Sequence, residues 1–532
     1  MAGKLKNIPA KAHPPHYMMH RYWGRKPHNV VNEYLRFYSK KGDVILDPFM
    51  GSGVTIIEAL KEERNAVGID LNPLSQFIVK GTIEPVDLDL LLKTYNKISE
   101  ELRKKYEYLY QTNCSICFSK SILVNAIYKE DKLKRVKGIC SNCGSFKKNA
   151  DKDDELRLLK IDKLFTKMKD LGNIDLPDDE ILQFVKRSGR THIKQLFTNR
   201  ALIILSELKR EILKSSNKKI KNSLMMCFSS MLPNVSRMIP GDYENISGKS
   251  GWVISKIWVP KIHTEKNIFI SLESRFKKIL AGKKESNHLI KSRKYKLFTK
   301  SSEYLKNLSP DSIDYIFTDP PYGDSIAYLG LSMFFNSWLG LKPAYSREII
   351  YDPFRGKRYD DYHNRMQKVF SELYRVIKPG KFLSFSFNNR DLQIWESVME
   401  SVKIAGFEFK NVTYQEQAVS SGTQGINYKN TLRGDFIYTF QKLTKPTKYP
   451  DNRNLNPNKI ILKKIHSLFE DKDFITSDYL FEKIIPFIIK RGLYRDENRK
   501  YIDLDKLVST QFKYKEISSK DKLFAWVKNI KL

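Results

Sequence analysis

The chain has 532 residues, and its 94 Lys and Arg against 60 Asp and Glu give a formal net charge of +34 at neutral pH. This excess is far beyond what solubility requires and indicates a polyanionic partner, nucleic acid being the natural one. Five cysteines exclude a disulfide scaffold, and no apolar run reaches the roughly 18 residues that span a bilayer. Residues 1–12 lack the apolar region of a secretion signal. We therefore expect a cytoplasmic protein, in the prokaryotic cytosol, of about two to four domains without a membrane partner.

Residues 44–73 predict a strand, a glycine turn, a helix and a second strand that ends on an acidic residue. Gly51 and Gly53 allow close backbone approach at the helix start, and Asp70 falls where a carboxylate can bind both ribose hydroxyls. Position 56 is Ile rather than the third glycine of a dinucleotide fingerprint, which argues against a nicotinamide or flavin enzyme. The segment therefore predicts a Rossmann-like βαβ unit and a nucleoside-containing cofactor.

Two Cys-x-x-Cys pairs, Cys114 with Cys117 and Cys140 with Cys143, are separated by a Lys-rich segment that can form a hairpin. Four thiolates in this arrangement can surround a zinc ion tetrahedrally. Redox use of the pairs is less favoured, because neither opens a helix after a strand as in a thioredoxin motif. The pattern predicts a structural zinc ribbon over residues 111–148, with no part in catalysis.

The cysteines lie in a long insertion, expected over residues 85–294, that begins with a charged helix and ends in a helical Lys-rich part. Residues 201–300 carry 21 basic and 7 acidic side chains. A solvated basic surface is the simpler interpretation of any one lysine run, but the whole-chain charge favours a region that grips DNA phosphates. The residues taken to support this are the lysine pairs Lys277 with Lys278 and Lys283 with Lys284, and the interleaved aromatics Trp252, Trp258, Phe269 and Phe276.

Strands predicted at 295–298 and 313–317 resume the sheet, and the second leads directly into Asp319-Pro320-Pro321-Tyr322. The prolines restrict the backbone, the carboxylate can accept a hydrogen from an exocyclic amino group, and the Tyr322 ring can stack on a base. Asp-Pro-Pro also occurs in ordinary turns, so this loop indicates a base-binding site only in combination with the βαβ unit. Together they predict a site for a flipped nucleobase.

The rest of the chain is expected to complete the sheet and to add a small domain. Strands are predicted at 383–387 and 436–440, and helices at 362–376 and 395–405. Residues 444–458 hold three prolines and several asparagines and are expected to be a linker. The domains are therefore 1–84 and 295–443 for the sheet, 85–294 for the insertion, and 459–532 for a small, basic, mostly helical C-terminal domain.

Several of these motifs resemble those of S-adenosylmethionine-dependent DNA amino-methyltransferases. Residues 47–53, 68–70 and 319–322 look like motifs I, II and IV of that family, residues 25–31 resemble motif X, and residues 376–383 look like the turn before a later strand. Residues 16–23, residues 319–329 and the cysteine cluster together resemble the adenine-specific DNA methylases with a zinc ribbon. The resemblance implies a class I methyltransferase sheet, an α/β fold.

The resemblance also implies ligands and roles for individual residues. Asp47, Phe49 and the turn from Gly51 to Gly53 would hold the amino-acid part of S-adenosylmethionine, Asp70 its ribose and Leu71 its adenine. For Lys26 two interpretations stay open, a cofactor contact or a surface charge. For Asp47 the alternatives are a cofactor contact or a residue that only caps its turn. Ser301 and Ser302 stand where related enzymes often have an acidic residue, which leaves recognition of the cofactor adenine in doubt. The catalytic set would be Asp319, Pro320, Pro321 and Tyr322.

The expected reaction is methyl transfer to the N6 amino group of adenine in double-stranded DNA, with the target base flipped. The resemblance places this in host defence or restriction-modification, with protein partners from such a system. Methylation of cytosine N4, or of a guanine amino group in RNA, can use the same loop and stays an alternative. A catalytically silent DNA-binding subunit is a further alternative, which the intact acidic and glycine positions disfavour.

Overall fold

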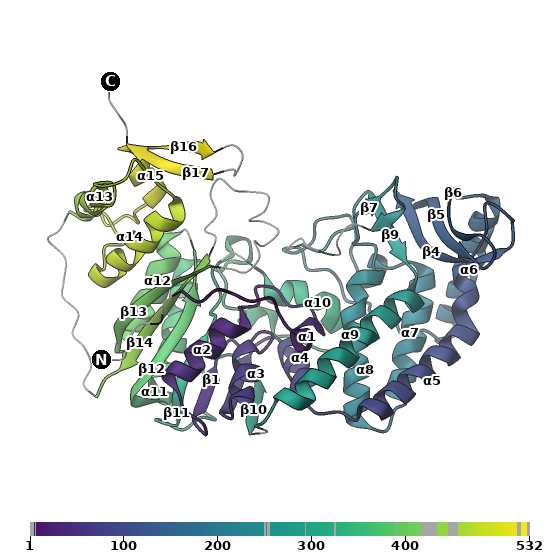
Figure 1. The fold of residues 1–532 in the computed structure, drawn as a ribbon, viewed down its shortest axis with the longest axis horizontal. Coiled ribbons are helices and arrows are strands. Elements are labelled where there is room, and N and C mark those ends of the chain that lie inside the picture. The colour runs from purple at the N-terminus through teal and green to yellow at the C-terminus, as the bar shows by residue number, and fades with distance from the viewer. Residues whose placement is uncertain are drawn as a thin grey trace.

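The computed structural model describes residues 5, 7–248, 252, 256–292, 294–323, 326–389, 391–416, 434–444, 456–518 and 523–528. The seven-stranded sheet and its helices occupy the left and centre of Figure 1, the insertion extends to the right, and the C-terminal elements lie above the sheet. Among the described helices, none is long and apolar enough to cross a membrane. The chain thus has three regions, and the candidate site belongs to the sheet.

The large sheet is mixed, with strand order β10-β2-β1-β11-β12-β14-β13. Its first five strands in that order are parallel, whereas β14 runs antiparallel to both neighbours. The strands span Val44–Asp47 (β1), Asn65–Asp70 (β2), Tyr295–Thr299 (β10), Ile313–Thr318 (β11), Ile377–Phe387 (β12), Phe407–Glu416 (β13) and Gly434–Lys442 (β14). The prediction of an α/β fold is confirmed, and β13 is a strand that sequence analysis missed.

Helices cover both faces of this sheet, and each face has its own apolar core. Ile45 and Tyr315 belong to the core with α2 and α3, whereas Leu46 and Ile316 belong to the core with α11 and α12. This alternation is expected, because successive side chains of a strand point to opposite faces. The helices are α1 (Pro15–Met18), α2 (His28–Tyr38), α3 (Val54–Lys61), α4 (Pro73–Ile83), α10 (Tyr328–Leu339), α11 (Tyr359–Val376) and α12 (Leu392–Ile404).

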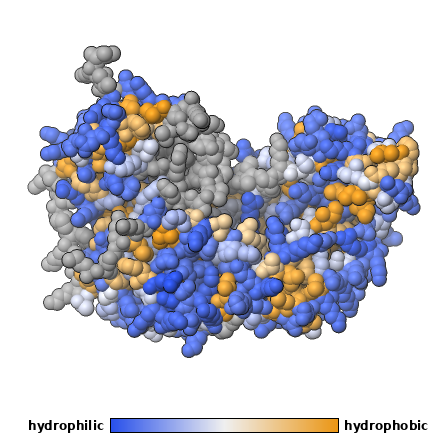
Figure 2. Space-filling model, in the orientation of Figure 1, coloured by the Kyte–Doolittle hydropathy of each residue, from blue (hydrophilic) through white to orange (hydrophobic). Residues whose placement is uncertain are grey.

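The insertion combines an antiparallel sheet with five long helices. Strands β3 to β6 follow one another in the sheet, and β9 pairs with β4. The elements are α5 (Leu88–Tyr106), β3 (Gln111–Asn113), β4 (Lys120–Lys129), β5 (Lys132–Cys140), β6 (Gly144–Asn149), α6 (Lys152–Asp170), α7 (Asn199–Leu213), α8 (Lys218–Val235), β9 (Ile262–Lys266) and α9 (Ile268–Leu289). Its core continues into the sheet region, since Phe334 and Trp338 of α10 pack against Phe197 and Phe228. On the face shown in Figure 2, the insertion is largely hydrophilic, with apolar patches between the hydrophilic areas.

Part of the expected DNA-contacting set is wrong. Lys283 is buried, and its Nζ donates to the carbonyl oxygens of Gly81 (2.6 Å) and Glu84 (2.5 Å) at the end of α4. These carbonyls lack partners within their own helix, so a lysine satisfies them. Trp252, Phe269 and Phe276 are also buried and belong to the core rather than to a surface that stacks on bases. Lys277, Lys278 and Lys284 are exposed.

The C-terminal region contains helices and, in addition, a small sheet that sequence analysis did not predict. It comprises α13 (Pro457–Leu468), β15 (Phe474–Ile475), α14 (Ser477–Arg491), α15 (Leu504–Ser509), β16 (Phe512–Ser518) and β17 (Leu523–Lys528), with strand order β15-β17-β16. It lies on the sheet region, where Arg495 pairs with Glu396 of α12 at 3.1 Å. Of the expected linker, residues 445–455 lie outside the described part of the chain, and α13 begins at Pro457.

Candidate active site

A pocket opens at the carboxyl ends of β1, β2 and β11, where three acidic residues come together. Asp47 ends β1, Asp70 ends β2, and Asp319 directly follows β11. All three line the pocket, which has an empty volume of about 1030 Å³, part of it open to solvent. Ligand sites of open parallel sheets form at this edge. The two segments predicted to carry the site, which the whole insertion separates in sequence, therefore share one pocket.

The glycine turn is fastened to Asp70 by backbone hydrogen bonds. The Gly51 and Asn72 N–H groups donate to the two oxygens of the Asp70 carboxylate, each at 2.8 Å. Gly53 has φ +79°, and a Cβ there would lie 2.3 Å from a methyl carbon of Val79, so this position requires glycine. Burial raises the pKa of Asp70 to about 6, although the Asn72 and Gly51 N–H groups oppose that rise.

Asp47 holds the turn together, as one of its two predicted roles requires. Its Oδ1 accepts hydrogen bonds from Thr318 Oγ1 at 2.7 Å and from the Phe49 N–H at 3.1 Å. Burial raises the pKa of Asp47 to about 7, against the effect of these donors. Asp47 therefore links β1 to the end of β11, and it also lines the pocket together with Phe49 and Leu71.

Lys26 lies between the carboxylates of Asp319 and Asp435. Its Nζ is 3.3 Å from Asp319 Oδ1 and 2.7 Å from Asp435 Oδ2, and it donates to the Tyr322 hydroxyl at 2.7 Å. Burial alone would lower the pKa of Lys26, but the two carboxylates outweigh it and the pKa is raised. The Asp319 pKa is raised to about 6, chiefly by burial and further by Asp435, while Lys26 lowers it.

The loop from Asp319 to Tyr322 is held by side chains of later elements. Tyr362 of α11 donates to the Pro321 carbonyl at 2.5 Å, and Asn389 Nδ2 donates to the Tyr322 carbonyl at 2.8 Å. The Tyr322 hydroxyl is 3.1 Å from Ser386 Oγ, and its ring meets Phe387 edge-on with centroids 5.1 Å apart.

The prolines of this loop lie differently, since Pro320 is buried whereas Pro321 lines the pocket. With its backbone held at two carbonyls, the loop presents the Asp319 carboxylate in a fixed position.

Sequence analysis missed several contacts of this site. Asp435 is 409 positions from its partner Lys26, and no spacing pattern connects them. Asn389 follows β12 within an Asn pair that is also typical of turns. After β10, Ser301 and Ser302 line the pocket, whereas Glu303 pairs with Arg365 at 2.6 Å. Lys26 is neither a surface charge nor remote from the loop, because it contacts Asp319 and Tyr322 while also lining the pocket.

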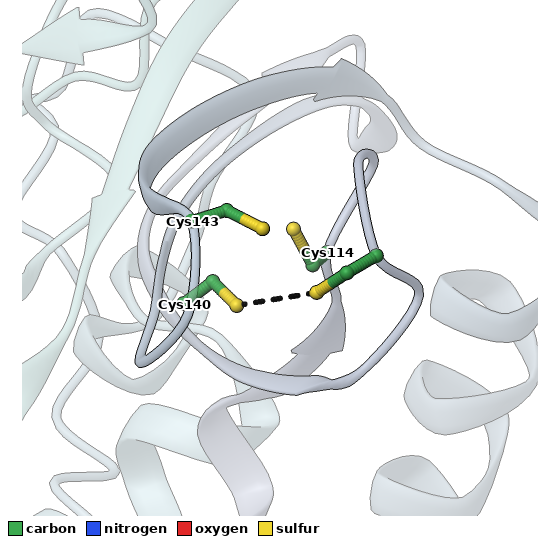
Figure 3. A group of neighbouring side chains, drawn as sticks. Cys114, Cys140 and Cys143 are labelled. Carbon is green, nitrogen blue, oxygen red and sulfur yellow. Dashed lines mark hydrogen bonds between the residues drawn. The ribbon is translucent and has the colours of Figure 1, made fainter.

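The four paired cysteines converge at one end of the insertion (Figure 3). The Sγ atoms of Cys114, Cys117, Cys140 and Cys143 all lie within 4.8 Å of one another, and those of Cys117 and Cys140 are 3.6 Å apart. Tetrahedral zinc with Zn–S bonds of about 2.3 Å would set neighbouring sulfurs about 3.8 Å apart. The arrangement therefore fits one tetrahedral ion. Cys227, the fifth cysteine, is buried in α8, away from this cluster.

Short stretches of the chain are similar to those of curated methyltransferases. Type II methyltransferase M.MjaII of Methanocaldococcus jannaschii is 33% identical over 86 residues, 15% of this chain and 16% of the relative. M.BsoBI of Geobacillus stearothermophilus is 37% identical over 87 residues, with the same coverage of 15% and 16%. M.BglI of Bacillus subtilis is 49% identical over 39 residues, 7% of this chain and 11% of the relative. The chain thus spans less than a fifth of the length of these relatives.

Solved structures give only weak likenesses. The TTHA0409 protein of Thermus thermophilus has 14% identity and a TM-score of 0.18, covering 31% of this chain and 61% of its own. A SAM-dependent methyltransferase from Methanosarcina mazei has 14% identity and a TM-score of 0.16, covering 28% and 68%. Such alignments place no residue of this chain.

The sequence model of a family described as DNA methylase matches residues 5–78 and 313–516, just over half of the chain. The first matched segment contains Lys26, Asp47 and Asp70, and the second contains Asp319 and Asp435. The interval between them contains the cysteine cluster, the rest of the insertion and β10 with the pocket residues 300–302. Asp47, Asp70 and Asp319 all fall within the match, and the chain belongs to the DNA methylase family.

Proposed function

We propose that this protein is an S-adenosylmethionine-dependent DNA methyltransferase that methylates the N6 amino group of adenine. The observation that carries the proposal is the single pocket in which the Asp70-bound glycine turn and the Asp319 carboxylate both lie. Membership of the DNA methylase family supports DNA as substrate. The similarity to Type II methyltransferases supports a role in restriction-modification or another host defence, with partner proteins from such a system.

The cofactor would bind at the β1 and β2 end of the pocket. Asp70 is a half-buried carboxylate at the end of β2, suited to a ribose, and the Gly51–Gly53 turn with Asp47 and Phe49 lies beside it for the amino-acid part. Leu71 lines the pocket next to Asp70 and would pack on the adenine. Bound S-adenosylmethionine supplies an activated methyl group, so the main task of the protein is alignment in a dry site.

The target amine would bind at the Asp319 end. The lone pair of an exocyclic amino group is delocalised into its ring, so the amine becomes more nucleophilic when hydrogen bonds hold its hydrogens out of the ring plane. The ionised Asp319 carboxylate can accept a hydrogen bond from one of these N–H groups, and the fixed loop 319–322 orients the base. Lys26 favours the ionised form of Asp319. Tyr322 would stack on the base, provided that the contact of its hydroxyl with Ser386 lets the ring face the base.

The insertion would hold the duplex and choose the sequence, because the pocket itself is occupied by the cofactor and one base. Exposed Lys277, Lys278 and Lys284 of α9 are candidates for phosphate contacts. Replacing Lys278 and Lys284 with Gln should flatten the slope of log DNA affinity against log salt concentration by the equivalent of about two phosphate contacts. An unchanged salt slope, or loss of DNA binding on deletion of residues 459–532 instead, would place the contact region elsewhere.

The cysteine cluster would bind one structural zinc ion and act as a zinc ribbon. The four sulfurs fit its tetrahedral shell, and all four positions would be filled by protein. The ion would stabilise the insertion and have no part in methyl transfer.

The direct test is to incubate plasmid DNA with the purified protein and S-adenosylmethionine and to analyse its nucleosides by mass spectrometry. We expect N6-methyladenine. N4-methylcytosine would keep the enzyme class and change the target base. If DNA stays unmethylated while structured RNA gains a methylguanine, or if neither substrate is methylated, the proposed activity is wrong.

A further inference from the structure

The short helical turn Pro353–Arg355 holds the side chain of Phe354 in solvent, where it is 100% exposed. Hydrogen bonds close the turn: the Phe354 N–H donates to Asp352 Oδ1 at 3.1 Å, and the backbones of Asp352 and Lys357 exchange two hydrogen bonds. Gly356 closes it with φ +71°. A single exposed apolar residue needs no explanation by itself. Phe354 differs from such residues because of its position next to the candidate active site and because of the residues around it.

The turn is fastened to the candidate active site. The Tyr351 N–H donates to the Gly323 carbonyl at 3.2 Å, immediately after the loop 319–322. Arg355 Nη1 donates to Glu348 Oε2 at 2.7 Å, and Glu348 lines the pocket. Phe354 is therefore held at a fixed position relative to Asp319, rather than on an independent loop.

Phe354 also lines a second hollow that adjoins the pocket. Ile326 and Ile349 line the pocket, while their sequence neighbours Ala327 and Ile350 line the hollow, which has an empty volume of about 1460 Å³. The insertion forms its other wall through Phe184, whose ring lies 3.9 Å from the Arg355 guanidinium carbon. Both regions of the protein thus meet beside the mouth of the site.

The surroundings of this hollow are mainly basic. Lys256 and Arg355 line it together with one acidic residue, Asp352, which pairs with Arg355 at 2.7 Å. Arg347, which lines the pocket, and Arg358 are exposed and add further positive charge. An exposed aromatic ring with basic side chains around it matches how proteins enter a base stack, since cations contact the phosphates and an apolar wedge fills the gap between bases.

We propose that Phe354 enters the DNA duplex at the step that the target base leaves, and stacks on the neighbouring bases while Asp319 binds the flipped amine. This rests on the proposed function. Stacking on an aromatic ring offsets part of the energy of unstacking. Phe354 is thus a positioning residue that acts on the duplex and has no contact with the methyl group.

The test compares two duplexes that carry the site mapped from methylated plasmid. One has the target base normally paired, and the other has it opposite an abasic position, which lowers the energy needed to flip it. Single-turnover transfer is measured with the full-length wild type, Phe354→Ala, Phe354→Trp, and Phe474→Ala as a control. Phe474 is an exposed phenylalanine of the C-terminal region. Affinity for S-adenosylmethionine is measured for each variant.

We expect Phe354→Ala to slow transfer to the paired duplex by about tenfold or more and to change transfer to the abasic duplex by less than about threefold. Phe354→Trp and Phe474→Ala are expected to stay near the wild-type rate on both. Equal losses on both duplexes, or no loss on the paired one, would overturn the role of Phe354 while leaving the proposed function intact. If the wild type leaves plasmid DNA unmethylated, so that no target site can be mapped, the proposed function is contradicted and this inference with it.

Discussion

The pocket end of the large sheet joins segments that the whole insertion separates in sequence, and the cysteine end of the insertion joins two nearby cysteine pairs, but different forces hold the two ends. At the pocket end, β1, β2 and β11 are buried between two apolar cores, and the positions of the acidic residues follow from where those strands end. At the cysteine end, the cluster around the sulfurs consists of Cys114, Cys140 and Phe146, with Cys143 packed against them. Apolar burial therefore holds the pocket end of the sheet in place, whereas the cysteine end of the insertion has little apolar core.

The two regions should therefore differ in how far they depend on the zinc ion proposed for the cysteine cluster. Four thiols that converge with little apolar core around them would leave the local fold of the cysteine loops to that ion, as in small zinc-binding domains. The pocket needs no such help, because its side chains are held by hydrogen bonds to buried strands and turns. Removing the ion should therefore open one region and spare the other.

The largest expected effect is complete loss of zinc when Cys114 and Cys117 are both replaced by Ser. The wild type should hold about one zinc per chain, and the variant none. Hydrogen exchange should rise sharply over residues 113–121 and 138–146 around the cysteines, while the parts of β4 and β5 that belong to the larger core and the affinity for S-adenosylmethionine stay unchanged. Cys227→Ala is the matched control and should keep its zinc. Metal analysis that finds no zinc in the wild type, or hydrogen exchange that rises equally in the large sheet, would contradict this difference between the two regions.

The second effect concerns the joint between the two regions, where Lys283 of α9 donates to the carbonyls of Gly81 and Glu84. Lys283→Met should leave both carbonyls without this charged donor and lower the free energy of unfolding by about 2–3 kcal/mol. The neighbouring Lys284 is exposed, so Lys284→Met should change stability by less than about 0.5 kcal/mol. Urea unfolding followed by tryptophan fluorescence would compare them. Equal midpoints for the two variants would show that the joint does not depend on Lys283.

The smallest effect is a shift of the pH profile. In the proposed reaction Asp319 acts as a carboxylate. Its pKa is raised to about 6, so transfer should fall as the pH drops through about 6. Lys26 lowers this pKa, and Lys26→Gln should therefore move the acid limb of kcat/KM upward by about one unit. Saturating S-adenosylmethionine would separate this from titration of Asp70, whose pKa is also raised to about 6. An acid limb that stays in place would remove Lys26 from the control of Asp319.

Sequence analysis could predict the parts of the site that follow from local pattern. Asp47 and Asp70 end apolar strands and Asp319 directly follows one, and the carboxyl ends of parallel strands meet at one edge. In the structure the three residues do line one pocket. The cysteine spacing likewise predicted convergence, and the sulfurs do lie together. In both cases the signal lies within a few residues of the functional side chain.

The rest depends on long-range packing, which local pattern does not encode. The contact between Lys26 and Asp435 joins residues 409 positions apart. The burial of Lys283 follows from where α9 crosses the end of α4, and in sequence it is indistinguishable from its exposed neighbour Lys284. Strands β13 and β16 are different, because both begin with alternating apolar and charged residues, Phe407 to Lys410 and Phe512 to Lys515, and sequence analysis overlooked this local signal. In β13 the alternation is interrupted by a register shift between Phe409 and Asn411.

In the proposed function, one pocket divides its work between two carboxylates, Asp70 for the cofactor and Asp319 for the target amine. The most direct test measures S-adenosylmethionine affinity and single-turnover transfer to DNA for Asp70→Ala and Asp319→Asn side by side. Asp70→Ala should weaken cofactor binding by about 10- to 100-fold. Asp319→Asn should bind the cofactor normally and lose about 10²- to 10³-fold in transfer. Loss of cofactor binding by Asp319→Asn, or unchanged binding by Asp70→Ala, would contradict this division.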